Sequence, residues 1–270
     1  MTSTDSTGAP EATSHLAFRP PLVFECQEDS SHDHTSDILP ILSRLYIACE
    51  ILQVKPETRF SVLIFLHRYT VSIGKRRSEY KSIQHWKWIA VACLFLGTKA
   101  EEESRRMRDV INLGEMLFSS NNNNDKDKGN KVTISENPPD LNEAYWEAKT
   151  KLVETEQIVL RWLGFDLSVS HPHRAVVLLL DSHPLQDKLM PVAFRRLNDA
   201  LFYGPALKHN VLVLACAAID LAQEEINTPT DESLSKGWNE QYNLKEAEIS
   251  RVKSILSNAT DYLKEHTKNE

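Results

Sequence analysis

The sequence predicts an all-α protein made of two similar helical repeats. Apolar residues recur at intervals of three and four over much of the chain, which is the spacing of one face of an α-helix. Only eight glycines occur in 270 residues, too few for the many turns of an all-β protein. Each half also contains one unusually apolar stretch rich in small residues, 88–97 and 212–222. This repetition predicts internal duplication of a five-helix unit.

The stretch 88–97 is the element around which we expect the first half to be organised. Its ten consecutive apolar or small residues show no strict period of 3.6, as expected of a helix with protein on most of its sides. At ~1.5 Å per residue it is too short to cross a bilayer, which needs ~20 residues. It is therefore predicted to be the central helix of a soluble domain. Lys99 lies at the rim of this helix, where it has little freedom, and is a candidate anchor for a partner.

The other predicted helices follow from start and stop signals. Asp37 can cap the first helix, Pro56 opens the second, and Gly74 ends it. In the first half, helices are expected over 37–52, 56–73, about 82–99, about 105–118 and about 141–164. In the second half, helices are expected over about 172–182, 190–203, 207–225 and 244–265.

Two segments lack the apolar side chains that a core needs. Residues 1–34 are polar and are predicted to be a flexible, disordered tail. Residues 119–140 contain four consecutive asparagines and a Pro-Pro pair, and are predicted to be a flexible insertion in the first repeat. The expected domains are therefore 35–168 and 169–270.

Charge and cysteine usage limit the class of protein. The net charge is −7 and the isoelectric point is near 5.8, which argues against general affinity for nucleic acid or a membrane surface. The four cysteines are far apart and three lie in apolar helical segments, so buried reduced thiols are expected. The first residues carry no apolar secretory segment. These features predict a nuclear or cytoplasmic protein.

Four motifs occur in order along the chain. They are His67-Arg68-Tyr69, the segment 95–102 (Phe-Leu-Gly-Thr-Lys-Ala-Glu-Glu) with 106–112, the segment 145–167, and His171-Pro172-His173. Together they resemble the cyclin box, and the His-Pro-His motif is similar to that of the transcriptional branch (cyclins T, K, L and Q, and fungal carboxy-terminal-domain kinase subunits). The resemblance covers residues 37 to 265. The chain departs from the pattern at Gly97, at Ala100, and at Trp238, where related cyclins often show a Trp pair.

This resemblance implies two tandem five-helix cyclin boxes, and it implies a site. Cyclins use a lysine at the end of the third helix and a glutamate on the fifth to hold the regulatory helix of a kinase, and Lys99 and Glu156 match these positions. The implied kinase-binding residues are Leu96, Lys99, Glu102, Glu156, Leu160, Phe165 and Leu167. Glu156 can also be judged without the resemblance. A carboxylate in an apolar stripe needs a partner if it is buried, although it could instead lie at the edge of the stripe and face water.

Other candidate sites have simpler structural explanations. His32 with His34, and His171 with His173, have metal-like spacing but no third ligand, so a turn before a helix is favoured, with His171 as a cap. The acids 101–103 lie beside Arg105, Arg106 and Arg108, which favours a solvated salt-bridge surface over a paired-carboxylate site. Phosphate loops, Ser/His/Asp motifs and a His-Arg-Asp catalytic loop are absent from the sequence. We therefore expect no enzyme, no cofactor and no metal.

Two functions follow. The first is a nuclear regulatory subunit that forms a heterodimer with a cyclin-dependent protein kinase and activates it, without direct contact to nucleic acid or membrane. The kinase would belong to the transcriptional group that acts on the RNA polymerase II carboxy-terminal domain. The second is a DNA-engaging adaptor of the transcription-factor-IIB type, supported by basic clusters at 75–77 and 105–108. The negative net charge and the lack of a zinc ribbon argue against the adaptor.

Overall fold

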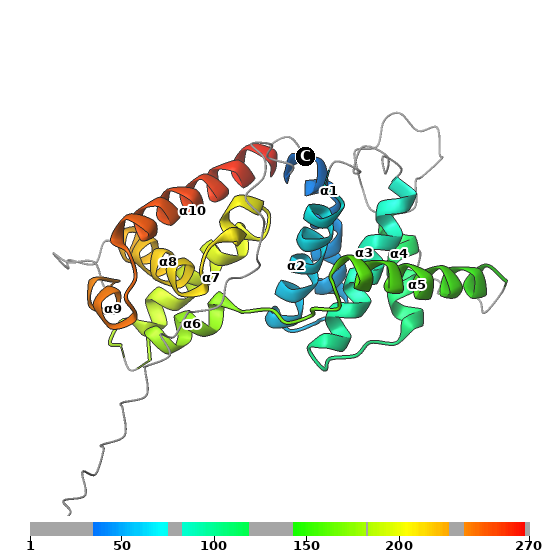
Figure 1. Cartoon of the computed structure of the whole chain (residues 1–270), viewed down its shortest axis with the longest axis horizontal. Coiled ribbons are helices and arrows are strands. Elements are labelled where there is room, and N and C mark those ends of the chain that lie inside the picture. The colour runs from blue at the N-terminus through cyan, green and yellow to red at the C-terminus, as the bar shows by residue number, and fades with distance from the viewer. Residues whose placement is uncertain (1–34, 75–82, 119–142, 182, 227–234, 268–270) are drawn as a thin grey trace, which may run out of the picture.

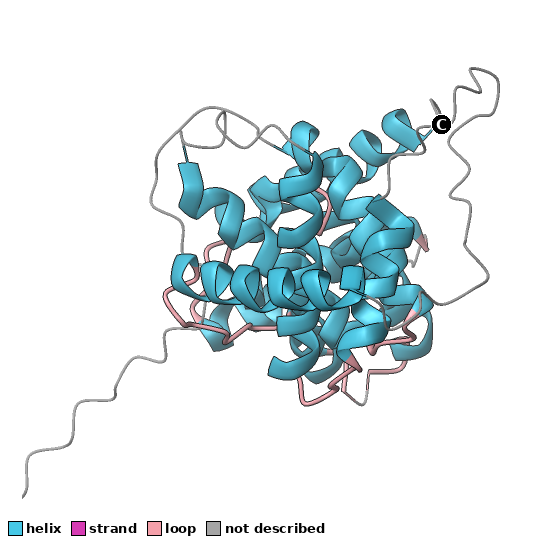
Figure 2. Ribbon diagram, turned by 90° about the vertical axis from the view of Figure 1, so that its right-hand side faces the viewer, coloured by secondary structure: helices cyan, strands magenta, loops and turns pink. Residues whose placement is uncertain are grey.

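The structure, a computed structural model, describes residues 35–74, 83–118, 143–181, 183–226 and 235–267. Within these ranges the chain is helical and has no β-strand, which confirms the all-α class (Figures 1 and 2). The helices are α1 (Thr35–Ile51), α2 (Pro56–Ile73), α3 (Ile83–Ala100), α4 (Met107–Phe118), α5 (Glu143–Trp162), α6 (Pro172–Leu179), α7 (Gln186–Ala200), the 3-10 helix η2 (Gly204–Lys208), α8 (Val211–Glu225), α9 (Ser235–Tyr242) and α10 (Glu246–Thr267). The predicted tail, the predicted insertion and the basic cluster at 75–77 lie outside the described residues.

Helix α3 is the centre of the first half, as the sequence predicted. It packs against α1, α2, α4 and α5, and its residues from Ile89 to Thr98 are all buried. Two glycines allow the close contacts. A Cβ atom on Gly97 would lie 2.3 Å from Val62 Cγ2 on α2, and one on Gly114 of α4 would lie 2.5 Å from Val91 Cγ2 on α3. The backbones of α2, α3 and α4 therefore approach too closely at these points for a larger residue.

Helix α8 has the same central role in the second half. It packs against α6, α7, α9 and α10. The short polar helix α9 was not predicted, because its sequence carries no apolar stripe. Helix α7 begins four residues before the predicted start and accommodates Pro191 in its second turn. The tandem helical repeats are thus confirmed, while the boundaries 35–168 and 169–270 stay a prediction.

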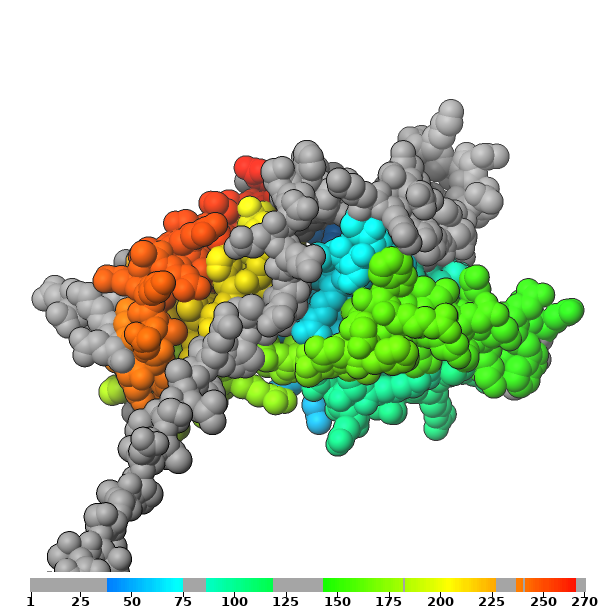
Figure 3. Space-filling view, in the orientation of Figure 1, coloured from blue at the N-terminus to red at the C-terminus, as the bar shows by residue number. Residues whose placement is uncertain are grey.

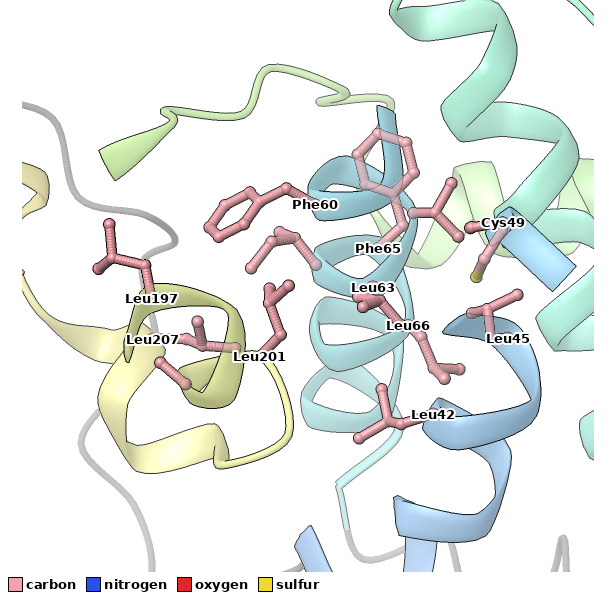
Figure 4. Packing of buried hydrophobic residues seen from close by; sticks show 14 of the residues in the cluster. Leu42, Leu45, Cys49, Phe60, Leu63, Phe65, Leu66, Leu197, Leu201 and Leu207 are labelled. Atoms are coloured by element: carbon pink, nitrogen blue, oxygen red, sulfur yellow. The ribbon is translucent and has the colours of Figure 1, made fainter. Parts of the chain in front are cut away.

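Helix α2 lies between the two halves and is buried on both sides. Figure 4 shows Leu197, Leu201 and Leu207 of the second half facing one side of α2, with Leu42, Leu45 and Cys49 of α1 on the other. The buried apolar residues of both halves form one continuous cluster. His67 on α2 also crosses the boundary, because its Nε2 donates to the Leu201 carbonyl oxygen at 2.7 Å. The two halves therefore share a core.

Three of the four cysteines lie in this core. Cys49, Cys93 and Cys216 are free and buried, as predicted, and burial raises the pKa of each thiol above its usual value. Cys26 is outside the described residues. No helix in the described part of the chain is both long enough and apolar enough to span a membrane.

Candidate protein-interaction site

Lys99 lies in the last turn of α3 and projects from the central helix to the surface. Its side chain is 42% exposed, whereas the residues just before it on the helix are buried. Phe95 lies one turn earlier on the same face, and the Lys99 ammonium nitrogen sits 4.0 Å from the centre of its ring. A cation over an aromatic face at this distance is attracted by the ring electrons. Lys99 is therefore held at the rim of α3, as the sequence predicted.

Glu156 on α5 is the partner of Lys99. Its Oε1 accepts a hydrogen bond from the Lys99 Nζ, so the two residues implied by the resemblance form an ion pair. The Glu156 side chain is only 13% exposed, and its helix packs through the buried Leu152 and Val159. The question left open by the sequence is thereby answered. The carboxylate is largely buried and is compensated by a cation from the neighbouring helix.

Helix α5 ends in a turn that presents Phe165 to solvent. The Phe165 N–H donates to the Leu160 carbonyl at 2.9 Å and the Gly164 N–H donates to that of Arg161 at 3.1 Å, which is a Schellman motif. Gly164 and Phe165 both have positive φ angles, 63° and 59°. Such a conformation costs a residue with a side chain of order 1–3 kcal/mol, yet Phe165 is 70% exposed. Phe165 is therefore an exposed aromatic residue in a strained turn, and it stays a candidate contact residue.

The remaining apolar residues predicted for this site differ in accessibility. Leu160 and Leu167 are half-buried and pack at the edge of the core. Leu96 is only 2% exposed, so the prediction that it belongs to the exposed apolar surface is wrong. Because α3 is enclosed by four other helices, the position three residues before Lys99 still lies in the core. Figure 3 shows α5 uncovered along one face of the molecule.

Glu102 contributes an unusual backbone conformation to the turn after α3. Its φ angle is 56° and its side chain is exposed. Its N–H donates to the Lys99 carbonyl at 3.1 Å, and the Glu103 N–H donates to the Thr98 carbonyl at 2.8 Å, so this helix also ends in a Schellman motif. The motif fixes the end of α3, and with it the base of the Lys99 side chain.

Glu103 closes this turn against the start of α2. Its Oε2 accepts from the Lys55 backbone N–H at 2.9 Å and from the Thr58 hydroxyl at 2.7 Å, and its Oε1 accepts from Arg105 at 2.8 Å. Burial acts to raise the pKa of Glu103, but these donors outweigh it and hold the pKa below its usual value. The position also suits a carboxylate, since a helix N-terminus carries a partial positive charge.

Glu101 and the two histidines form a joint between the halves. Glu101 accepts from the Ser61 hydroxyl at 2.6 Å and lies 3.3 Å from Nε2 of His171, at the start of α6. His171 and His173 both contact the ring of Phe60 on α2, with ring centres 5.4 and 5.3 Å away. The acids at 101 and 103 are therefore structural. The expected salt bridge to a nearby arginine is present between Glu103 and Arg105, but neither Glu101 nor Glu103 lies on a solvated surface.

Burial sets the protonation of the same histidines. It lowers the pKa of His171, against the effect of Glu101, and it lowers the pKa of His173 to about 4. His173 Nε2 lies 3.2 Å from the Asn198 side-chain oxygen on α7. His171 occupies the N-cap position of α6, but its side chain makes no capping bond, so its predicted capping role is wrong. The described residues contain no cluster of three or more metal-ligating side chains.

The second half carries a similar ion pair with the charges exchanged. Aligning the segment Leu96–Lys99 with Leu221–Glu224 puts Glu224, at the end of α8, at the position of Lys99. Glu224 accepts from Lys253 of α10 at 2.6 Å. The neighbouring Glu225 pairs with Arg195 and Arg196 of α7. The third and fifth helices of each repeat are thus joined at the surface, but the third helix contributes a cation in one half and an anion in the other.

Sequence reasoning missed Phe95, Glu101 and Glu103. The signal for Phe95 is present in the sequence, since an aromatic residue four positions before a lysine shares its helix face. Apart from Arg105, the partners Ser61, Lys55 and Thr58 of these two acids lie forty or more residues away in the chain, so no local pattern identifies them.

Comparisons with known proteins agree on one family. No family model matches the chain. It is 34% identical to cyclin-L1 of Danio rerio over 143 residues, which are 52% of this chain and 26% of that protein. It is 29% identical to cyclin-T1-5 of Arabidopsis thaliana (76% of this chain, 33% of that protein) and 25% identical to cyclin pch1 of Schizosaccharomyces pombe (74% and 55%). The chain therefore spans between about a quarter and just over half of these relatives.

Solved structures show the same fold. A chain of the yeast RNA Pol II CTD kinase CTDK-1 complex matches with a TM-score of 0.65 at 18% identity, covering 89% of this chain and 75% of that one. A viral cyclin from herpesvirus saimiri matches with a TM-score of 0.52 at 14% identity, covering 85% and 88%. The chain therefore has the fold of these cyclin structures. Its sequence relatives are cyclins L and T and pch1, so the chain resembles the transcriptional branch of the cyclin family.

Proposed function

We propose that this chain is the regulatory subunit of a cyclin-dependent protein kinase and that it binds the kinase through the surface around Lys99 and Glu156. The observation that carries the proposal is the surface ion pair between α3 and α5. The exposed ring of Phe165 at the end of α5 adds to it. The proposed contact residues are Lys99, Glu102, Glu156, Leu160, Phe165 and Leu167, with Leu96 supporting them from the core.

The chain would activate the kinase by binding and would itself perform no chemistry. An active protein kinase needs the glutamate of its αC helix to pair with the lysine of strand β3. A rigid surface that binds αC only in this position shifts the kinase towards its active state. The size of the shift is set by the difference between the affinities of this chain for the active and the inactive kinase. The shared core and the fixed ends of α3 and α5 provide such rigidity.

We further propose that the kinase belongs to the transcriptional group, acts on the carboxy-terminal domain of RNA polymerase II, and forms a nuclear heterodimer with this chain. The support is the sequence similarity to cyclins L and T and the structural similarity to a chain of the CTDK-1 kinase complex. A direct DNA contact has weak support, because Arg105 is already engaged with Glu103 and with the carbonyl oxygens of Leu52 and Gln53.

The test is reconstitution with purified kinases. Each cyclin-dependent kinase catalytic subunit of the source organism, free of its own cyclin, is mixed with this chain, and both binding and phosphorylation of a polymerase-tail peptide are measured. We expect one or more transcriptional kinases to bind and to be activated. Binding to none of them, together with salt-dependent retention on DNA, would overturn the proposal in favour of a DNA-engaging adaptor.

A further inference from the structure

The Lys99 ammonium is held on two sides within the described structure. On one side its Nζ bonds to Glu156, and on the other it lies over the ring of Phe95, 4.0 Å from the centre. Phe95 is only 6% exposed and belongs to α3, which packs against four other helices. The ring is therefore a fixed platform beneath a cation that is itself accessible to a partner.

We infer that Phe95 is a positioning residue, which fixes the Lys99 ammonium for partner binding through the electrons of its ring; this inference rests on the proposed function. A lysine side chain normally has large rotational freedom, and a contact with a partner must remove it. The ring and Glu156 restrict that freedom in the free chain, so less remains to be lost on binding. A partner that covers Lys99 also removes water from the cation–ring contact, and such contacts strengthen on desolvation.

A second lysine of the same helix shows what a purely structural arrangement looks like. Lys87 lies over the ring of Trp88, 5.0 Å from its centre, and pairs with Glu115 at 2.6 Å. The Lys87 side chain is buried, so it offers no surface to a partner. Lys99 has the same kinds of contacts but keeps 42% of its side chain exposed. The exposed ammonium group of Lys99 can therefore contact a partner, whereas the buried one of Lys87 cannot.

The experiment changes the electron density on the face of the Phe95 ring while keeping the shape of the ring. Phenylalanine analogues with one, two and three fluorine atoms are incorporated at position 95, and the affinity for the kinase identified by reconstitution is measured together with thermal unfolding. Each fluorine withdraws charge from the ring face. We expect the affinity to fall stepwise, by roughly two- to thirty-fold over the series, since the contact is attractive and becomes desolvated. The melting temperature should change little, because the packing is preserved.

Two controls separate electronic from packing effects. The same series at Phe65, which is fully buried and has no cation over its ring among the described residues, should leave the affinity unchanged. In a Lys99→Ala background, the series at position 95 should also have no effect on affinity.

The outcomes distinguish this inference from the proposed function. If the unmodified chain binds no kinase, the proposed function fails and the role of Phe95 fails with it. If the chain binds, and Lys99→Ala weakens binding, a flat series at position 95 overturns the role of Phe95 alone. An equal loss of affinity with and without Lys99 would assign the effect to packing and would overturn it as well.

Discussion

Lys99 and Glu156 differ in their access to water, and this difference limits how much the ion pair can contribute to the stability of the free chain. The lysine side chain is 42% exposed and the glutamate side chain 13% exposed. Because water screens the exposed member, such a pair contributes at most ~1 kcal/mol to the stability of the free chain. A partner that covers both residues removes that screening. The pair should then matter more for binding than for folding.

Replacing either residue should therefore separate stability from activation. For Glu156→Ala we expect little change in melting temperature, and for Lys99→Ala a modest fall, because it leaves the largely buried Glu156 carboxylate unpaired. For both we expect a loss of roughly 2–5 kcal/mol in kinase binding, because the remaining charge is left unpaired when covered. Thermal unfolding and a titrated kinase assay measure the two effects. Lys253→Ala removes the matching lysine of the second half and serves as the control. A large loss of stability with normal activation per folded molecule would make the pair structural.

Phe165 should likewise matter for binding rather than for the stability of the free chain. Its φ angle of 59° favours glycine, so Phe165→Gly relieves strain of order 1 kcal/mol that offsets the added freedom of the unfolded chain. The melting temperature should stay equal or rise, while kinase affinity should fall because the exposed ring is gone. Calorimetry and a binding titration check this. If the melting temperature drops by several degrees, the ring is part of the fold.

At the scale of elements, α3 depends on close approach to its neighbours. A Cβ atom added to Gly97 would lie 2.3 Å from Val62 Cγ2 and 3.2 Å from Val62 Cα. Closely packed interiors tolerate an added methyl group poorly, since the surrounding side chains must leave their preferred rotamers. The distance between α2 and α3 is therefore set at this contact.

Gly97→Ala should destabilise the chain by about 1–3 kcal/mol, even though alanine favours a helix more than glycine does. Val62→Ala removes the clashing methyl group at the cost of a small cavity. The double variant should be more stable than the sum of the single effects predicts, with a coupling of about 1 kcal/mol. Urea unfolding of the four proteins gives this coupling. Simple additivity would show that the helices move apart without strain.

The elements that sequence reasoning found are those whose signals are local. Pro56 and Gly74 bound α2 as expected, and the apolar stretch after Trp88 became the central helix. Helix α9 was missed because its polar sequence has no stripe and includes Gly237. Leu96 was misplaced because helical spacing identifies which residues share a face but not how many other helices enclose it. The number of helices that surround a given helix face depends on the tertiary structure.

At the scale of the whole molecule, the joint between the halves should respond to pH. The pKa of His173 is about 4 in the folded chain against 6.5 in a free histidine, since burial disfavours its charged form. Between these values the unfolded chain binds the proton more readily, so stability is complete above pH 6.5 and is lost as the pH falls towards 4. Asn198, His171 and Glu57 also act on this group.

The unfolding free energy should therefore fall between pH 6.5 and 4, and His173 should account for at most about 3 kcal/mol of the fall. His173→Phe keeps a ring against Phe60 and cannot be protonated, so its pH dependence should be shallower over the same window. Unfolding curves at several pH values measure both slopes. Equal slopes would show that His173 is not held neutral in the folded chain.

The exchanged charges of the two halves predict unequal effects on binding. Lys99→Glu should abolish most kinase affinity, because it sets two carboxylates against each other at the proposed contact. Glu224→Lys should leave affinity nearly unchanged, although it breaks the exposed pair with Lys253. Parallel binding titrations compare the two reversals. Similar losses in both would mean that the two halves share the kinase contact.

Much of the candidate site could be predicted, and the missing part has a common cause. Lys99, Glu156 and Phe165 came from motif positions in the sequence, and the structure brings Lys99 and Glu156 into contact. The supports could not be found in this way. Glu103 meets Lys55 and Thr58 from 48 and 45 residues away, and Phe60 meets two histidines of the other half. Such contacts depend on how the helices cross in space, which cannot be predicted from short-range patterns in the sequence.

Because α2 is buried on both sides, the two halves of the chain cannot be separated without exposing apolar residues. A first half expressed alone would expose Phe60 and Leu63 of α2 to water and would leave His67 without the Leu201 carbonyl. A contiguous apolar surface of this kind promotes aggregation. The first half should therefore stay soluble only in the presence of the second, although each half has its own central helix.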